Sequence, residues 1–238
     1  MREDELKTGL KQRIIIIAIA VVLLGSAIAS YAAIIILNSS SSSSVGTIDE
    51  EKILAYEEAY AEKLNEFKNS TSADYAKFSP YRSEIKAYDE SAANEALEKR
   101  DLAIGGGREL ASGDTDYLAY YVGWCADGSI FDSSFDQDTD PTAFSKVLNA
   151  GDGMISGWNE GVVGMRLGGI REITVPSEKA YGDQLEICGG VGKPLKFLVM
   201  AVPNEEPLKS LATELDDAFM RMQYAYYGID YDAIKGVN

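Results

Sequence analysis

The chain of 238 residues has no histidine, only two cysteines, and 22 basic residues against 38 acidic ones. The lack of histidine removes the commonest general base and metal ligand, which excludes a Ser-His nucleophile or a His-ligated metal within this chain. Cys125 and Cys188 stand far apart and neither belongs to a CxxC pair, so a thiolate metal site is not expected either. The net charge of −16 would repel a phosphate backbone. We therefore expect no metal, no cofactor and no nucleic-acid partner.

Long apolar runs are also scarce, with one exception near the N-terminus, where residues 14–37 are almost wholly apolar. A helix of that length, at about 1.5 Å per residue, spans the roughly 30 Å hydrocarbon layer with some tilt. Four basic residues lie within 1–13 and none follows until Lys52, so the positive-inside rule places 1–13 in the cytoplasm and the rest of the chain outside. The sequence predicts a single-pass anchor in the cell membrane, with the membrane as a partner through this helix.

A cleaved signal peptide is the alternative interpretation of the same segment. Small residues at Ala27–Ser30 could form a cleavage site, which would leave a chain that begins near Tyr31. The apolar run continues past that point, where the apolar region of a signal peptide normally stops. We therefore favour an uncleaved anchor.

The next two segments read as a linker and a helical region. Residues 38–47 contain an unbroken serine run, which is typical of a flexible linker. In the helical segment 48–100, Thr47 and Glu50 fit a capping box, and apolar residues then recur at helical spacing at Ile53, Tyr56, Tyr60, Leu64 and Phe67. This helix either binds a partner or client, or packs on a second helical segment near Tyr88–Arg100 or on the domain that follows.

Strand patterns dominate residues 101–203. They occur at Leu102–Ile104, Asp116–Val122, Ile170–Val175 and Leu195–Val202, and the one short helical pattern begins near Trp158. Glycines 105–107 lack the Lys-Ser/Thr of a phosphate loop, so a nucleotide site is not indicated. Many strands and one short helix predict an α+β fold in which an antiparallel sheet wraps around that helix.

The C-terminal segment, residues 204–238, predicts another amphipathic helix followed by a tail. Asn204 and Pro207 fit a helix start, and Gly228 fits its end. Its apolar positions fall on one face: Leu208, Leu211, Leu215, Phe219, Met222 and Tyr226. That face either packs on its own chain or holds a client or a second copy.

Several motifs between Asp101 and Val202 resemble those of the FKBP-type peptidyl-prolyl isomerases, in the family's order and near its spacing. They are Tyr121-Val122-Gly123, Asp127-Gly128, Phe131-Asp132-Ser133-Ser134, Ile155 with Gly157-Trp158 and Glu160-Gly161, Gly164-Met165 with Gly168-Gly169, Pro176, Ala180-Tyr181-Gly182, and Leu195 with Phe197. The resemblance implies an antiparallel half-barrel around a short helix. It also implies catalysis of cis-trans rotation at X-Pro bonds, which needs no nucleophile, metal or cofactor.

The resemblance also assigns roles to residues of an apolar pocket. Trp158 forms the floor under the proline ring, and the walls are Tyr121, Phe131, Phe144 and Phe197. Met154 and Ile155 line the rim, and the Ile155 backbone donates a hydrogen bond to the substrate. Asp132 faces the twisted carbonyl, and the Tyr181 hydroxyl binds a neighbouring carbonyl. The aromatic residues could instead be ordinary core, and Asp132 could simply cap the Ser133-Ser134 turn.

Two further expectations follow from the resemblance. The stretch Gln137–Asp140 is acidic where the family often has a basic residue able to pair with the pocket acid. The loop 183–193, which normally carries apolar residues over the pocket, contains Cys188, and Cys125 follows the first pocket strand. If the domain lies outside the membrane, where disulfides persist, we expect these two cysteines to pair and to pin the loop to the sheet.

The sequence thus predicts a membrane-anchored prolyl isomerase that assists the folding of proline-containing extracytoplasmic polypeptides. The alternative is a non-catalytic peptide-binding, chaperone or scaffold module of the same fold at the cell surface.

Overall fold

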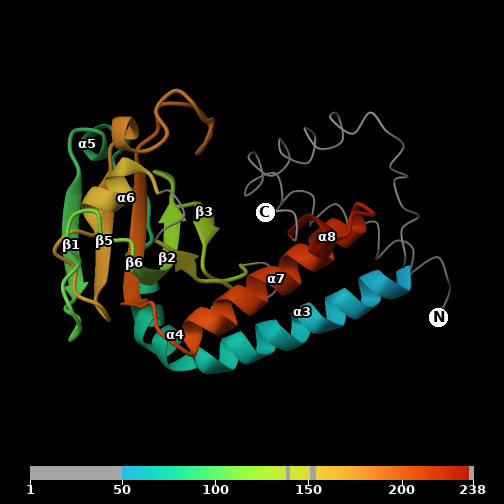
Figure 1. The fold of residues 1–238 in the computed structure, drawn as a ribbon. Coiled ribbons are helices and arrows are strands. Elements are labelled where there is room, and N and C mark those ends of the chain that lie inside the picture. The colour runs from blue at the N-terminus through green and yellow to red at the C-terminus, as the bar shows by residue number, and fades with distance from the viewer. Residues whose placement is uncertain (1–49, 138–139, 151–153, 236–238) are drawn as a thin grey trace. The chain divides into compact units, whose positions relative to one another are not determined.

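A computed structural model describes residues 50–137, 140–150 and 154–235, and all the elements below belong to one compact unit, residues 48–238 (Figure 1). The expected cytoplasmic segment 1–13, membrane anchor 14–37 and linker 38–47 lie outside the described residues. Within the described part of the chain, no helix combines the length and the apolar character that crossing a bilayer requires.

An antiparallel sheet forms the centre of this unit. Its main path runs β1-β5-β6-β2-β3, and β4 pairs with β2 at one end. The strands are β1 (Glu98–Ala103), β2 (Tyr117–Trp124), β3 (Ile130–Ser133), β4 (Leu148–Asn149), β5 (Ile170–Val175) and β6 (Leu195–Pro203). The strand patterns at 116–122, 170–175 and 195–202 are confirmed. The strand expected at 102–104 begins earlier, at Glu98, inside the segment expected to be helical.

The two central strands, β2 and β6, are buried on both faces, and alternate side chains enter two separate hydrophobic clusters. In β2, Tyr117, Ala119 and Tyr121 enter the first cluster, whereas Leu118, Tyr120 and Val122 enter the second. This division follows from the two-residue period of a strand. Each face of the sheet therefore needs its own cover.

The short helix α6 (Ser156–Gly161) covers the first face, and two glycines let it lie directly on β5. A Cβ at Gly157 would stand 2.2 Å from Val175 Cγ1, and one at Gly161 would stand 2.6 Å from Ile173 Cγ2. Real side chains do not pack this closely. The glycines of the Gly-Trp and Glu-Gly motifs therefore set the depth at which Trp158 sits in the fold.

The second face is covered by α4 (Ser72–Phe78), by the C-terminal part of α3 (Glu50–Ser70) and by the N-terminal part of α7 (Leu208–Tyr226). The rest of α3 and α7 projects away from the sheet, and the short α8 (Tyr231–Lys235) follows α7 (Figure 1). Phe67, Phe78, Leu211 and Leu215 from these helices join the second cluster. Short 3-10 turns, η1 (Ser79–Glu84) and η2 (Ser177–Lys179), and the single turn α5 (Glu90–Ala93) complete the described elements.

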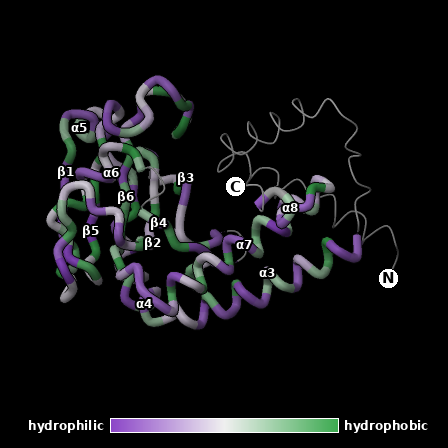
Figure 2. Tube along the Cα trace, viewed as in Figure 1, coloured by the Kyte–Doolittle hydropathy of each residue, from purple (hydrophilic) through white to green (hydrophobic). Residues whose placement is uncertain are grey.

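Helices α3 and α7 pack side by side along their length (Figure 1), with Tyr60 and Phe219 in ring contact at 5.6 Å. Figure 2 shows hydrophobic residues alternating with hydrophilic ones along both helices. Both amphipathic helices are thus confirmed. Of the two partners expected for α3, the helical segment near Tyr88–Arg100 is wrong, because that stretch holds only α5 and the start of β1, whereas packing on the domain that follows is confirmed for Phe67. The apolar face of α3 packs instead on α7 and, through Phe67, on the sheet.

Candidate functional site

Four aromatic side chains from three strands and one helix meet at the first face of the sheet. Tyr121 and Phe197 each lie edge-on to Trp158, with centroids 5.7 and 5.6 Å apart, and Phe131 lies edge-on to Phe197 at 5.8 Å. Such T-shaped contacts are favoured between aromatic rings and fix their orientation. We call Tyr121, Phe131, Trp158 and Phe197 the aromatic cluster. The structure brings these four predicted pocket residues together.

Gly123 makes room for this arrangement within β2. A Cβ at this position would lie 2.5 Å from Phe131 Cζ and 3.0 Å from Phe197 Cε1. Only the absence of a side chain lets both rings lie over the strand. The glycine of the Tyr-Val-Gly motif is therefore part of the site's construction.

Trp158 forms the inner end of the cluster. Its Nε1 donates a hydrogen bond to Tyr117 Oη at 3.0 Å, and only 2% of the residue is exposed. The cluster reaches solvent through Phe131, Met154, Ile155 and Tyr181, which are half-buried or, for Tyr181, 36% exposed. Met154 and Ile155 pack against the first hydrophobic cluster, and their role as the rim of a pocket stays a prediction.

The Asp132 carboxylate lies beside the cluster and accepts three hydrogen bonds. The Tyr121 hydroxyl donates to Oδ2, while Lys146 Nζ at 2.6 Å and the Ser133 N–H at 2.8 Å donate to Oδ1. The cation that the acidic stretch 137–140 lacks thus comes from Lys146. The sequence offered no signal for this pairing, because Lys146 lies in an irregular segment. The bond from Ser133 means that Asp132 also caps its own turn.

Two tyrosine hydroxyls complete the polar part of the site. Burial, reinforced by the Asp132 charge, raises the pKa of Tyr121 well above its ordinary value, and the same two causes raise the pKa of Tyr181. Both phenols therefore remain protonated donors at neutral pH. Among the described residues no group pairs with the Tyr181 hydroxyl or with the Ile155 N–H, so both donors can serve a ligand.

The predicted pocket wall Phe144 does not belong to this group. Its ring stacks on Tyr120 with centroids 3.9 Å apart and contacts Tyr75 and Phe78, all within the second cluster. The backbone after it turns sharply, because Ser134 O accepts hydrogen bonds from both Ser145 and Lys146 N–H groups, at 2.8 and 3.2 Å. This turn places Phe144 on one side of the sheet and Lys146 at Asp132 on the other.

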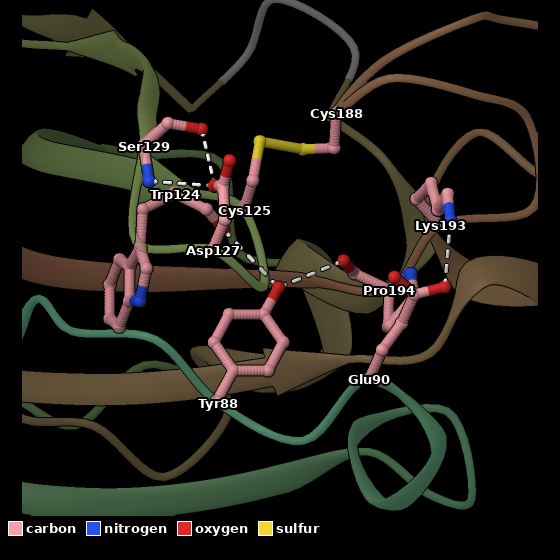
Figure 3. The surroundings of a disulfide bond; sticks show 9 residues. All are labelled: Tyr88, Glu90, Trp124, Cys125, Asp127, Ser129, Cys188, Lys193 and Pro194. Carbon is pink, nitrogen blue, oxygen red and sulfur yellow. Dashed lines mark hydrogen bonds and ion pairs between the residues drawn. A yellow bond between two sulfur atoms is a disulfide. The ribbon is translucent and has the colours of Figure 1, made fainter.

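The predicted pairing of Cys125 with Cys188 is present, with an S–S distance of 1.98 Å and a Cα–Cα distance of 5.4 Å (Figure 3). Cys125 directly follows β2, and Cys188 lies in the loop between η2 and β6 that begins with Tyr181. Ile187 and Cys188 both pack against the first hydrophobic cluster. The disulfide thus joins the loop to the strand that supplies Tyr121.

A separate cavity of about 480 Å³ lies over β1 and β5, away from the aromatic cluster. Its lining is mostly charged, and Arg100 and Glu172 are joined there by an ion pair of 2.8 Å. This charged surface does not suit an apolar ligand. Within the described ranges, no three acidic or cysteine side chains gather in a way that could hold a metal ion.

Comparisons with known proteins point to one family. A family model described as FKBP-type peptidyl-prolyl cis-trans isomerase matches residues 107–202. An FK506-binding protein of Neisseria meningitidis serogroup B is 39% identical over 102 residues, which are 43% of this chain and 87% of that protein. A probable FK506-binding protein of Corynebacterium glutamicum is 39% identical over 104 residues, 43% of this chain and 78% of that protein.

A solved peptidyl-prolyl cis-trans isomerase from Pseudomonas syringae pv. tomato is 26% identical and covers 56% of this chain and 93% of its own, with a TM-score of 0.35. The matched region contains the whole aromatic cluster, whereas α3, α7 and β1 lie outside residues 107–202. On the relatives' identity and coverage, the chain belongs to the FKBP-type peptidyl-prolyl cis-trans isomerase family.

Proposed function

We propose that the aromatic cluster, Asp132 and the two donors at its rim accelerate cis-trans rotation of X-Pro bonds in extracytoplasmic polypeptides as they fold. The observation that carries this proposal is the meeting of four aromatic rings with one carboxylate fixed by three hydrogen bonds. Apolar walls with a few oriented polar groups are the usual design of a small ligand site.

The reaction needs only this kind of site. The barrier to rotation is about 18–20 kcal/mol because the planar amide must lose its partial double-bond character, while the two X-Pro isomers differ by only about 0.5–1 kcal/mol. A catalyst has to bind the twisted amide better than the planar one. Aromatic walls exclude the water that stabilises the planar carbonyl, and fixed dipoles stabilise the twisted form.

Each side chain has a role in this scheme. The proline ring rests against Trp158 between Tyr121 and Phe197. The Tyr181 hydroxyl and the Ile155 N–H bind substrate carbonyls, because both lack partners within the described chain. Asp132, held in place by Lys146, faces the carbonyl that rotates. No proton is transferred and no covalent bond is made or broken.

Two features support a location outside the cytoplasm. A disulfide persists in oxidising compartments, and the described structure contains one. The apolar segment 14–37 follows a basic N-terminus, which favours export of everything after it. Protease added to intact cells that make the protein should digest the isomerase domain. Protection until the membrane is broken would contradict this location.

The catalytic proposal is tested by the relaxation of a short X-Pro peptide with full-length protein and with Asp132→Val. We expect the wild type to accelerate relaxation and Asp132→Val to lose most of the effect. Asp127→Val is the matched control, because Asp127 lies in the same hairpin and its carboxylate, among the residues that the structure describes, bonds only Ser129 of its own turn. Equal rates for the wild type and Asp132→Val would overturn the role of Asp132.

A second function, peptide binding without appreciable catalysis, is favoured by one observation. Trp158 is 2% exposed, whereas Phe131, Met154 and Ile155 of the same hydrophobic cluster are half-buried, so a peptide can lie across these three residues without its proline ring reaching the indole. Tight binding of a proline peptide together with an unchanged relaxation rate would establish this second function and exclude the first.

A further inference from the structure

The loop from Tyr181 to Pro194, hereafter the site loop, is built to be pliable. It contains four glycines, and Gly182, Gly189 and Gly192 have positive φ angles of 53°, 78° and 68°. Glycine allows many backbone conformations, so ordering such a loop has a large entropic cost. The base and the tip of the loop therefore each need an attachment if the tip is to stay packed on the first hydrophobic cluster.

The base of the site loop is fastened by hydrogen bonds and an ion pair. Gly192 N–H donates to Gly182 O at 2.8 Å, which closes the neck of the loop. Tyr88 Oη donates to Pro194 O at 2.9 Å, and Lys193 pairs with Glu90 at 2.9 Å (Figure 3). Tyr88 and Glu90 belong to the segment Lys86–Asn94, hereafter the strap, which lies outside the family match at 107–202.

The strap itself is tied to the sheet. The Tyr88 N–H donates to Ala126 O at 2.9 Å, and Trp124 Nε1 donates to Lys86 O at 3.1 Å. At its far end, the Ser177 N–H donates to Asn94 Oδ1 at 2.7 Å, close to the start of the site loop. These contacts with the strap therefore hold the base of the site loop independently of its tip.

The tip, residues 183–191, is held in a different way. Its hydrogen bonds stay within the loop, such as the pair between Ile187 and Gly190 at 2.9 and 3.2 Å. Within the described chain, no hydrogen bond or ion pair joins the tip to anything outside the loop. The disulfide to Cys125 and the packing of Ile187 and Cys188 on the first cluster are its attachments.

We propose that the Cys125–Cys188 disulfide is a redox-sensitive fastening that holds Ile187 over the site, so that its reduction weakens substrate binding without unfolding the domain. This inference rests on the proposed prolyl isomerase function of the aromatic cluster. When the disulfide is formed, the tip completes the apolar rim of the site. When it is reduced, the pliable tip leaves the first hydrophobic cluster, while the strap keeps the base of the site loop and Tyr181 in place.

The chemistry of the switch is thiol-disulfide exchange with a dithiol. A dithiol thiolate attacks the sulfur of Cys188, which is half-buried, and displaces the thiolate of the buried Cys125. The second thiol of the reductant then displaces Cys188. Two electrons and two protons pass from the dithiol, which becomes a cyclic disulfide, and the protein gains two thiols.

The test compares full-length protein in oxidised form, after dithiothreitol treatment, and as Cys125→Ser/Cys188→Ser. The readouts are KM and kcat for an X-Pro peptide, direct binding of that peptide, and hydrogen exchange at residues 183–191. We expect reduction to raise KM and the dissociation constant roughly five-fold, the effect of losing the packing of one half-buried aliphatic side chain, Ile187, with kcat within about two-fold. Exchange at the tip should become faster, while exchange at the strap stays slow.

The double serine variant should behave like the reduced protein and should not respond to dithiothreitol, which controls for other effects of the reductant. Equal peptide affinity and equal tip exchange before and after a reduction confirmed by mass would overturn the inference. Cooperative loss of the whole fold on reduction would overturn it as well. An oxidised protein without isomerase activity would instead refute the proposed function, while peptide binding and tip exchange would still decide whether the fastening exists.

Discussion

Adding one methyl group at Gly157 tests how α6 places Trp158. In Gly157→Ala the new Cβ would lie 2.2 Å from Val175 Cγ1 and 3.0 Å from Lys179 O. Overpacking of this kind costs about 1–3 kcal/mol, and the upper end applies because a main-chain carbonyl cannot rotate away. The better helix propensity of alanine returns about 1 kcal/mol. The net loss is about 2 kcal/mol, and because a unit of this size loses about 2–4 °C per kcal/mol, the melting temperature should fall by about 4–8 °C.

The assay is thermal unfolding followed by circular dichroism, with prolyl isomerase activity measured below the transition. Gly106→Ala is the matched control, because a Cβ there meets nothing within 4 Å. Adding Val175→Ala to Gly157→Ala removes the nearest contact and should recover about 1 kcal/mol relative to the sum of the single variants. The reasoning is refuted if Gly157→Ala melts within about 1 °C of wild type or if Gly106→Ala loses as much.

Three further predictions concern charge. Arg171 is 4% exposed and bonds the Asp101 carboxylate and two main-chain carbonyls, so Arg171→Met should lower the free energy of unfolding in urea by about 3 kcal/mol. Arg221→Met, which breaks an exposed ion pair, should lower it by under about 1 kcal/mol. Similar losses in the two variants would contradict a stabilising role for the buried Arg171 bonds. Lys146→Met should lower kcat/KM roughly five-fold, because the Asp132 carboxylate loses a hydrogen-bond donor, and should change the free energy of unfolding by under about 1 kcal/mol. Lys146→Arg should retain most activity. Unchanged kinetics in Lys146→Met would refute a role of Lys146 in positioning Asp132. Burial raises the pKa of Tyr60 to about 12, so at high pH the native state keeps the phenol proton that the unfolded state loses. As the pH rises from 9 to 11, the free energy of unfolding should therefore fall by about 1.4 kcal/mol more in the wild type than in Tyr60→Phe. Equal falls in the two proteins would contradict the raised pKa.

Much of the fold follows from local patterns in the sequence. The strand at Ile170–Val175 has the predicted bounds, and the helices around Tyr60 and Leu215 have the predicted type, because period-two and period-3.6 patterns report directly on which face is buried. The partner of α3 could not be predicted, because an apolar stripe shows that a face is covered but not by which segment. The helix that covers it, α7, lies about 150 residues further along the chain.

The same distinction holds for the site: residues on regular elements could be predicted, and residues in irregular segments could not. Tyr121, Phe131, Trp158 and Phe197 stand on regular elements or next to glycines that fix their placement, and the structure brings them together as expected. Phe144 lies between strands, where no period fixes the direction of a side chain, and two hydrogen bonds to one carbonyl turn it away. Lys146 and the strap tyrosine Tyr88 act through long-range contacts that no local pattern records.

The central claim is that the aromatic cluster is where proline isomerisation is catalysed. Trp158 belongs to the aromatic cluster, whereas Phe67, an equally buried aromatic residue on α3, packs on the opposite face of the sheet and belongs to neither the strap nor the site loop. The most direct measurement is therefore kcat/KM for one X-Pro peptide with Trp158→Leu and Phe67→Leu, each at a temperature where it is folded. We predict that Trp158→Leu loses at least roughly ten-fold while Phe67→Leu stays within about two-fold of wild type. Equal activities in the two variants, or a wild-type protein that leaves the relaxation rate unchanged, would contradict the claim.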